Sequence, residues 1–336
     1  MIRLKDIALR AGVSIMTVSK ALRNAPDVSD ATRARIKVLA QQLGYVPDPG
    51  AQSLRTRTTK LFGLVIPTIT NPVFTRIVAA LEEQAHQAGY DTLLAHTDNT
   101  PAREETVIRR LLARRVDGLF VAPAYRMESE ARIYHELKAR GTPVVLLGQP
   151  APFCSQFPFV SPDDLVGGYH AAQHLLKLGH RRIAFLSGKL VAPWAHLRFE
   201  GYRRALREFG LEVDDKFVFN AGSTIEDGAK AGLQFLDEKC KATAIQAVND
   251  LVAVGCAEAL LKQGLKIPDD ISIIGFGNVL MAEHFRVPLS TMRQAKARLG
   301  DVAFDLMSRL LRRESVDSRL MPAELTVRAS TAAPRG

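Results

Sequence analysis

Residues 4–22 decide the fold of the N-terminal part, and they read LKDIALRAGVSIMTVSKAL. The first half of this stretch places its aliphatic residues on one helical face, and Gly12 stands where a glycine commonly ends a helix. Ser14 follows at an N-cap position, where its hydroxyl can accept from free amides of the next helical turn. The stretch therefore predicts two short helices joined by a tight turn.

The second of these helices has an outward face of unusual composition. Its inward stripe consists of Val18, Ala21 and Leu22. Two large apolar side chains, two hydroxyls and one cation remain outside, namely Ile15, Met16, Thr17, Ser19 and Lys20. Such a set suits thymine methyl groups, phosphate oxygens and a guanine edge, in that order.

A third helix is predicted after Ser29, which stands at its N-cap. Apolar residues recur there at i, i+3, i+4 and i+7, and Gly44 ends the pattern. Three such helices form a helix-turn-helix unit, whose second helix enters the DNA major groove. The alternative is a small three-helix bundle without a role in nucleic-acid binding, but an idle helix would carry more charge over residues 15–20.

Positive charge is concentrated in the same region. The chain of 336 residues has a formal net charge of +10. Residues 1–60 hold eleven Lys and Arg against four Asp, a net charge of +7. Concentrated positive charge is expected of a surface that binds phosphates, although basic surface segments are common in other proteins.

The order of these motifs resembles the head of the lactose/galactose-repressor (LacI-type) family. The resemblance rests on residues 4–22 and continues through Val28-Ser29, Thr32-Arg33 and 44–47. It implies that Ile15, Met16 and Lys20 contact bases. It also implies that Ser14 belongs to the DNA-binding surface, and the residues at positions that mostly hold phosphates are Thr17, Ser19, Ser29, Thr32 and Tyr45. Lys20 stands where arginine is more common in the family, so a two-point grip on guanine becomes a single contact.

Residues 47–59 form a predicted linker, which opens with the structure-breaking sequence Pro47-Asp48-Pro49-Gly50. The simplest interpretation is a flexible tether. The resemblance instead implies a hinge helix that begins at Ala51, with Leu54 inserted into the minor groove. Such a short helix is expected to form only when two copies pair on DNA, because helix nucleation is costly.

From Lys60 onward, apolar strands alternate with amphipathic helices. The predicted strands are 61–66, 92–96, 118–122, 144–147, 183–187, 244–248 and 271–276. The clearest helical patterns between them are 74–88, 164–178 and 250–264. This alternation predicts parallel sheets covered on both faces, in an α/β body of two doubly wound subdomains. Residues 157–162 and 287–294 are the predicted crossings, and ligands of such sheets bind beyond the carboxyl ends of the strands.

The body also resembles the sensor domain of the same family, which has the fold of periplasmic sugar-binding proteins. Residues 178–184, 197–202, 248–250 and 267–276 carry this resemblance. It implies a sugar-type effector held by Asn71, Phe74, Trp194, Arg198, Asn249, Asn278 and Gln294. Two of these positions have other interpretations, since Phe74 can belong to the core and Asn249 can simply cap the helix that follows.

The chain departs from the family after the predicted strand 271–276. Family members usually carry an aspartate there that grips sugar hydroxyls, whereas this chain has Gly277-Asn278. With Arg198 and His196 nearby and one carboxylate fewer, the sequence favours an acidic sugar or sugar acid over a neutral sugar.

The resemblance and composition lead to one overall expectation, a cytoplasmic homodimeric transcriptional regulator, with repression favoured over activation by family habit. We expect a head at 1–46, a linker at 47–59 and an effector domain at 60–336. The first subdomain is expected at about 60–160 and 292–322, and the second at about 161–291 and 323–330. No apolar run is long enough for a membrane span, and the three cysteines suggest reduced core thiols.

Two alternatives compete with this expectation. An enzyme is disfavoured because the sequence has no dinucleotide fingerprint, phosphate loop, nucleophile elbow or zinc-binding helix motif, and we expect neither cofactor nor metal. A pure ligand-binding protein would show no salt-dependent affinity for DNA, whereas a repressor loses affinity steeply as salt rises. The C-terminal residues 323–336 lack a heptad repeat, which favours a dimer over a tetramer.

Overall fold

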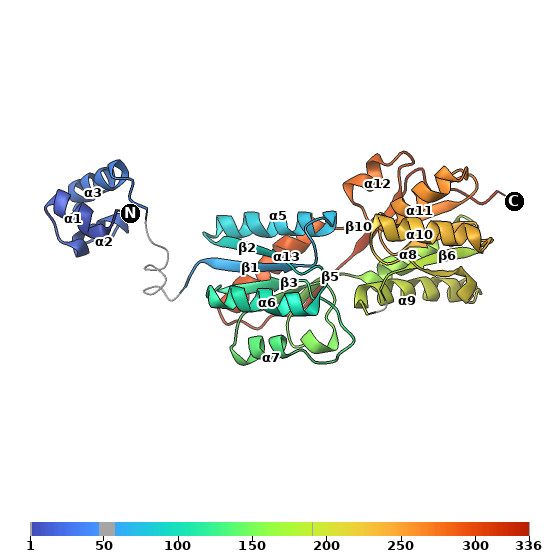
Figure 1. Ribbon diagram of the computed structural model, residues 1–336, viewed down its shortest axis with the longest axis horizontal. Coiled ribbons are helices and arrows are strands. Elements are labelled where there is room, and N and C mark those ends of the chain that lie inside the picture. Colours follow the sequence, from blue (N-terminus) through green and yellow to red (C-terminus); the bar gives the residue numbers. More distant parts are fainter. Residues whose placement is uncertain (1, 47–57, 190, 336) are drawn as a thin grey trace. The chain divides into compact units, whose positions relative to one another are not determined.

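A computed structural model describes residues 2–46, 58–189 and 191–335 of the chain. Its contacts divide the protein into two compact units, Met1–Thr59 and Lys60–Gly336. We call the described part of the first unit the head, and that of the second unit the body; both are drawn in Figure 1.

The head consists of the three predicted helices, α1 (Leu4–Ala11), α2 (Ile15–Leu22) and α3 (Asp30–Gln42). Gly12 ends α1 with φ of 65°, a conformation that glycine adopts without strain. Ser14 and Ser29 cap α2 and α3, each accepting a hydrogen bond from a backbone amide. A small apolar core then forms between the helices from Ile7, Ala8, Ala11, Val18, Ala21, Val28, Ile36 and Ala40.

The body contains, within its described residues, two six-stranded sheets, one in each of two lobes. The first sheet has the order β11-β5-β4-β3-β1-β2, with β1 (Leu61–Ile66), β2 (Asp91–His96), β3 (Gly118–Val121), β4 (Val144–Leu147), β5 (Phe159–Pro162) and β11 (Arg319–Met321). The second sheet has the order β12-β10-β9-β8-β6-β7, with β6 (Ile183–Ser187), β7 (Val218–Asn220), β8 (Ala244–Ala247), β9 (Ser272–Gly277), β10 (Ser290–Gln294) and β12 (Ala323–Thr326). All neighbours pair in parallel except β10 and β12.

Helices cover both faces of each sheet (Figure 1). In the first lobe these are α5 (Pro72–Gln87), α6 (Pro101–Ala113), α7 (Arg132–Ala139) and α13 (Lys296–Leu311), with a short 3-10 helix η1 (Pro152–Cys154). In the second lobe they are α8 (Asp164–Lys177), α9 (Pro193–Glu208), α10 (Ile225–Asp237), α11 (Asp250–Lys262) and α12 (Leu280–His284), with η2 (Asp215–Phe217). This burial on both faces explains why the strands appear in the sequence as continuous apolar runs.

Three chain segments cross between the lobes. The chain leaves the first sheet after β5 and returns after β10, and β11 and β12 lie in different sheets. The expected changes of lobe at residues 161 and 292 lie slightly too early. Ser161 and Pro162 still pair with β11 in the first sheet, and residues 292–294 still pair with β12 in the second.

The edge strand β2 differs from the inner strands. None of its residues is fully buried, and Leu94 is 48% exposed. An edge strand presents unpaired backbone groups, which natural proteins usually cover or protect with charge.

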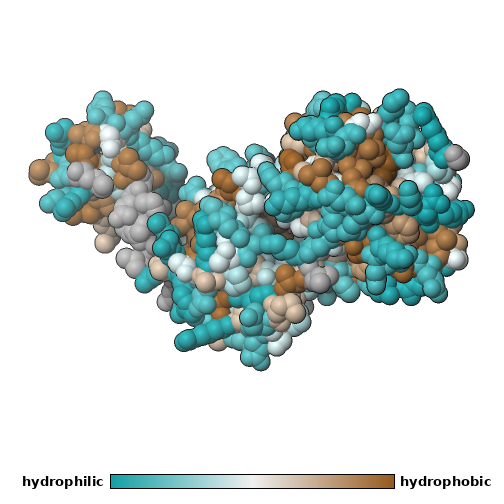
Figure 2. Space-filling view, turned by 45° about the vertical axis from the view of Figure 1, so that its right-hand side comes forward, coloured by the Kyte–Doolittle hydropathy of each residue, from teal (hydrophilic) through white to brown (hydrophobic). Residues whose placement is uncertain are grey.

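The surface of the body is mainly hydrophilic and is interrupted by hydrophobic patches, as Figure 2 shows.

None of the described helices is long and apolar enough to span a lipid bilayer. The three cysteines are free thiols, with Cys154 and Cys256 buried and Cys240 half-buried. Burial raises the pKa of the Cys256 thiol to about 12, so the thiolate is disfavoured there.

Candidate functional site

The outward face of α2 presents the two apolar side chains that the sequence predicts. Ile15 is 52% exposed and Met16 is 67% exposed, although burial would remove such side chains from water. The Ser14 hydroxyl accepts from the Thr17 amide at 3.0 Å and lies 2.8 Å from the Thr17 hydroxyl. The cap therefore starts the helix and engages the Thr17 side chain.

Lys20 is held by an acidic neighbour that the sequence analysis did not consider. Its ammonium group forms an ion pair with Asp27, in the loop between α2 and α3. The hydrogen bond from Lys20 lowers the pKa of the Asp27 carboxyl. Both side chains remain partly exposed, so the pair is weak and Lys20 can exchange Asp27 for a phosphate or a base.

The remaining predicted head residues lie around the same helices. Ser29 accepts from the Thr32 amide, and its hydroxyl donates to Thr32 Oγ1 at 2.9 Å. Ser19 is half-buried on α2, and Tyr45 packs against the head core. The predicted hinge residues Ala51 and Leu54 lie outside the described residues.

A cleft of about 470 Å³ lies in the body, lined by residues from both lobes. Its walls come mainly from segments that follow the carboxyl ends of strands, as expected for doubly wound sheets. Six predicted positions line it, namely Asn71, Phe74, Trp194, Arg198, Asn249 and Gln294. The structure thus brings together side chains that are up to 223 residues apart in the sequence.

Arg198 reaches the cleft because α8 and α9 pack without space between them. A Cβ atom on Gly168 would lie 2.4 Å from the Arg198 carbonyl oxygen, and one on Gly201 would lie 2.2 Å from the Leu165 carbonyl oxygen. Only glycine fits at both positions. This close approach sets Arg198, on α9, against the first turn of α8.

The Arg198 guanidinium is neutralised by a buried carboxylate. Its Nε and Nη2 atoms lie 2.8 and 2.7 Å from Asp164 Oδ1, and its Nη1 atom donates to the Val248 carbonyl oxygen at 2.6 Å. Asp164 is 1% exposed, and burial raises the pKa of its carboxyl, opposed by Arg198. The guanidinium also lies 3.6 Å from the Phe276 ring centroid and 4.9 Å from that of Trp194.

Four amide side chains line the cleft, Asn71, Asn99, Asn249 and Gln294, and two of them cap helices. Asn71 and Asn249 each accept from a helix N-terminal amide, so both act as N-caps, and Asn249 also donates to the Ser223 carbonyl oxygen. Capping of α11, the alternative for Asn249, is therefore confirmed. Gln294 is 6% exposed and lines the cleft. A nearly buried amide on a cleft wall is suited to bind a polar ligand.

Asn278 departs from the expectation. It is absent from the described lining of the cleft, and its side-chain oxygen accepts from Arg328 at 2.8 Å. Its φ of 51° is left-handed, and it follows Gly277 with φ of 138°, so the turn directs the Asn278 side chain to the C-terminal segment. His196 is exposed and likewise absent from the described lining.

Several residues in the cleft were missed by the sequence analysis. These are Asn99, Tyr125, Asp164, Glu226, Asp250 and Phe276. Tyr125 follows the carboxyl end of β3, which is a signal that the sequence offered. Its hydroxyl donates to the Gln149 carbonyl oxygen at 2.7 Å.

A buried acidic side chain fixes the loop that carries Tyr125. Glu104, on α6, is fully buried, accepts from the Ala124 amide and the Tyr134 hydroxyl, and forms an ion pair with Arg126. Burial raises the pKa of the Glu104 carboxyl, and these three partners oppose the shift. No local pattern in the sequence predicts this network, because its members are 20 to 30 residues apart.

A helix-turn-helix head joined to a body with an enclosed cleft defines a class of protein, the DNA-binding regulator with its own ligand-binding domain. Residues 3–48 match the family model of bacterial regulatory proteins of the lacI family. Residues 59–329 match the model of periplasmic binding proteins and the sugar binding domain of the LacI family. The chain belongs to the LacI family of transcriptional regulators, whose members are regulators rather than enzymes.

Individual relatives agree with this assignment over nearly the whole chain. The HTH-type transcriptional repressor CytR of Escherichia coli (strain K12) is 34% identical over 98% of this chain and 96% of that protein. The structure of the lac repressor dimer bound to operator and the anti-inducer ONPF matches with a TM-score of 0.89 and 27% identity, covering 99% of each chain. The complex of the transcriptional regulator CelR with cellobiose matches with a TM-score of 0.74 and 28% identity, covering 98% of this chain and 100% of that one.

Proposed function

We propose that this chain is a repressor in which Ile15, Met16 and Lys20 contact operator bases and the cleft binds an uncharged, hydroxyl-bearing effector. The pairing of Arg198 with Asp164 carries the second part of this proposal. Arg198 is the one cation among the described residues that line the cleft, whereas the carboxylates there are Asp164, Glu226 and Asp250. An anionic effector would meet a cation that is already neutralised and an excess of negative charge.

The preference for a sugar acid therefore loses its physical basis. That expectation rested on Arg198 and His196 near the cleft and on one carboxylate fewer, whereas Arg198 is paired with Asp164, His196 is absent from the described lining, and three carboxylates belong to that lining. Trp194, Phe74 and Phe276 offer apolar faces, and Asn71 and Gln294 offer directed hydrogen bonds. This combination suits a sugar ring, in agreement with the cellobiose in the CelR complex.

The effector class is tested by thermal unfolding of the full chain against neutral mono- and disaccharides, sugar acids and sugar phosphates. A ligand at 100 times its Kd stabilises the folded state by about 2.7 kcal/mol, which raises the melting temperature measurably. We expect a shift with a neutral sugar, and we expect Gln294→Ala to reduce it. The control Gln87→Ala alters an exposed amide on α5 and is expected to keep the full shift. Stabilisation by sugar acids alone would contradict the proposal.

DNA binding by the head is tested by the dependence of affinity on salt. If the head neutralises phosphates, log K falls linearly with log salt concentration, with a slope of about −0.9 for each phosphate contact. A fluorescent duplex selected from genomic fragments by the protein itself is a suitable probe. An affinity for DNA that does not change with salt would contradict DNA binding by the head, and the chain would then be a ligand-binding protein only.

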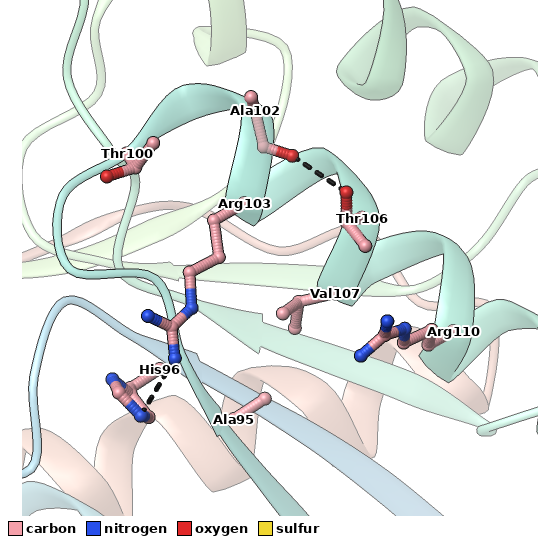
Figure 3. Close-up of a pocket in the computed structure, with 8 residues that line it drawn as sticks. All are labelled: Ala95, His96, Thr100, Ala102, Arg103, Thr106, Val107 and Arg110. Atoms are coloured by element: carbon pink, nitrogen blue, oxygen red, sulfur yellow. Dashed lines mark hydrogen bonds between the residues drawn. The ribbon is translucent and has the colours of Figure 1, made fainter.

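We further infer a homodimer, with β2 and α6 forming part of the pairing surface. LacI-family repressors act as dimers. The edge strand β2 presents unpaired backbone groups that a second copy of the chain could cover. A groove beside this edge is lined by Ala95, His96, Thr100, Ala102, Arg103, Thr106, Val107 and Arg110 (Figure 3). Arg103 lies 3.0 Å from His96 Nε2 there. Leu94→Glu is expected to weaken the dimer in sedimentation velocity, and an unchanged dimer would exclude this surface.

The remaining parts of the proposal concern location and domain limits. Since the DNA-binding relatives act on operators, we place the chain in the cytoplasm. The working domains are a head at 1–46, a linker at 47–59 and an effector domain at 60–336, in keeping with the division of contacts at Thr59. The proposed phosphate-binding residues are Thr17, Ser19, Ser29, Thr32 and Tyr45, and Ser14 is proposed as part of the same DNA-binding surface.

A further inference from the structure

Lys296 makes contacts that join the two lobes beside the cleft. It is the first residue of α13, and α13 belongs to the first lobe, where Leu299 and Ala303 lie in the apolar core. The Lys296 ammonium group donates to the carbonyl oxygens of Gly277 at 2.6 Å and Asn278 at 2.9 Å. Gly277 is the last residue of β9, which belongs to the second lobe, and Asn278 follows it directly.

The turn that Lys296 contacts also forms part of the cleft. Val279 follows Asn278 directly and lines the cleft. Asp250, another lining residue, accepts from the Val279 amide at 2.9 Å and from the Thr291 hydroxyl at 2.5 Å. The same turn is therefore held from the second lobe by Asp250 and from the first lobe by Lys296.

The position of Lys296 is electrostatically unusual. A lysine at a helix N-terminus faces the positive end of the helix dipole, which disfavours its charge. Burial lowers the pKa of the Lys296 ammonium group, and the nearby carboxylate of Asp250 opposes that shift. The helix dipole and burial thus both disfavour the charge of Lys296. Its described hydrogen bonds nevertheless go to the Gly277–Asn278 turn of the opposite lobe.

The turn also excludes side chains that would disturb this arrangement. A Cβ atom on Gly275 would lie 2.3 Å from Asp250 Oδ1, so the strand must carry glycine where the carboxylate approaches. Gly277 has φ of 138°, which is disfavoured for other residues. Its carbonyl oxygen accepts from Lys296 in that conformation.

From these contacts we infer that Lys296 is a positioning residue, which sets the orientation of the lobes by binding the Gly277–Asn278 turn where the chain crosses between the lobes, beside the cleft. The inference deepens the proposed function, on which it rests, because it concerns the regulation of the same cleft. An effector that moves Asp250, or Val279 beside the Gly277–Asn278 turn, changes the contact between Lys296 and that turn. The orientation of one lobe relative to the other then changes as well. Removing the ammonium group frees the lobes without removing any residue that lines the cleft.

The chain supplies its own reporter for this inference. Trp194 is its single tryptophan, and it lies on the second lobe, lining the cleft. We would measure acrylamide quenching of Trp194 fluorescence in the full-length protein and in Lys296→Met, well below the unfolding temperature. Lys296→Met is expected to raise the quenching constant about twofold, because more molecules populate an open cleft.

Matched variants separate positioning from simple stabilisation. Lys296→Arg keeps donors that reach both carbonyls and is expected to restore wild-type quenching. Lys262→Met removes an exposed lysine on α11, whose ion pair with Glu258 stays within the second lobe, and is expected to change nothing. If Lys296→Met does not fold, Lys296→Gln keeps one donor and is expected to give a smaller rise.

Wild-type quenching in folded Lys296→Met or Lys296→Gln would overturn the inference, even if the melting temperature fell. A rise that Lys296→Arg does not restore would also overturn it. The measurement uses neither DNA nor effector, so a failed effector search leaves its result intact.

Discussion

Arg198 is the side chain on which the cleft depends most strongly. It joins the buried Asp164, the carbonyl of Val248 and two aromatic rings in one network. A buried ion pair adds little net stability relative to apolar packing. Removing one partner nevertheless destabilises the folded protein strongly, because the other partner remains as a buried, uncompensated charge.

Replacing Arg198 with methionine is therefore expected to lower the free energy of unfolding by about 3 to 5 kcal/mol at neutral pH. Burial raises the pKa of the Asp164 carboxyl, so the folded protein binds a proton there more readily than the unfolded chain does. This proton uptake stabilises the folded state at low pH, and the stabilisation is lost as pH rises through the pKa of Asp164 in the folded protein. The loss in Arg198→Met is thus expected to be smaller at pH 5 than at pH 7.5. Urea unfolding at both values checks this. The double variant Arg198→Met, Asp164→Asn is the control, and a loss equal to that of the single variant would contradict the argument.

Lys20 and Asp27 allow a similar test on DNA. Asp27→Asn frees Lys20 and removes one negative charge, so it is expected to raise operator affinity several-fold at low salt. Lys20→Ala is expected to weaken operator binding by about 1 to 3 kcal/mol and to relax specificity at the base pair that Lys20 contacts.

The control is Asp30→Asn, which changes the net charge of the head equally but leaves the Lys20 pair intact. Fluorescence anisotropy at several salt concentrations measures all three variants. Equal effects of Asp27→Asn and Asp30→Asn would mean that only net charge matters.

The C-terminal segment, residues 327–335, is held against the second sheet by two histidines. His180 is 1% exposed and lies within 2.9 Å of both Thr243 Oγ1 and the Ala332 carbonyl oxygen, and His174 contacts Thr331 at 3.0 Å. Burial lowers the pKa of both imidazoles from the ordinary value of 6.5.

Acidification is therefore expected to loosen this segment. Above pH 6.5 the imidazoles are neutral in both the folded and unfolded states, so stability is complete. As pH falls below that value, the unfolded chain binds protons that the folded chain does not, and the free energy of unfolding decreases. Urea unfolding between pH 7.5 and 5.5, with amide exchange of residues 327–335, measures this. His180→Gln is expected to flatten the dependence, and an unchanged slope would refute the assignment to His180.

The strands and caps could be predicted from sequence because their causes are local. Residues 61–66, 144–147 and 183–187 form strands with the predicted bounds, since burial on both faces leaves a continuous apolar run. Ser14 and Ser29 cap the helices they were predicted to cap.

Long-range contacts could not be predicted in this way. Asp163 caps α8 locally, since its side chain accepts from the Val166 amide. Asp164 instead binds Arg198, 34 residues away, because two glycine contacts bring α8 against α9. Asn278 was misplaced for the same reason, since Arg328 lies 50 residues beyond it.

The whole molecule links two binding events. The head recognises DNA, and the cleft in the body binds a ligand. Thermodynamic linkage requires that an effector which changes operator affinity by some factor has its own affinity changed by DNA by the same factor. A coupling of 1 to 3 kcal/mol corresponds to a factor of about 5 to 150.

The most direct test of this account measures the coupling factor twice, once as the effect of operator on sugar affinity and once as the effect of sugar on operator affinity. The neutral sugar identified by thermal shift is titrated into the protein with and without saturating operator duplex, and the duplex is titrated with and without saturating sugar. The account predicts two equal factors, each of at least about fivefold. A sugar that binds in the cleft with no effect on operator affinity would contradict it, because the cleft would then not control the head.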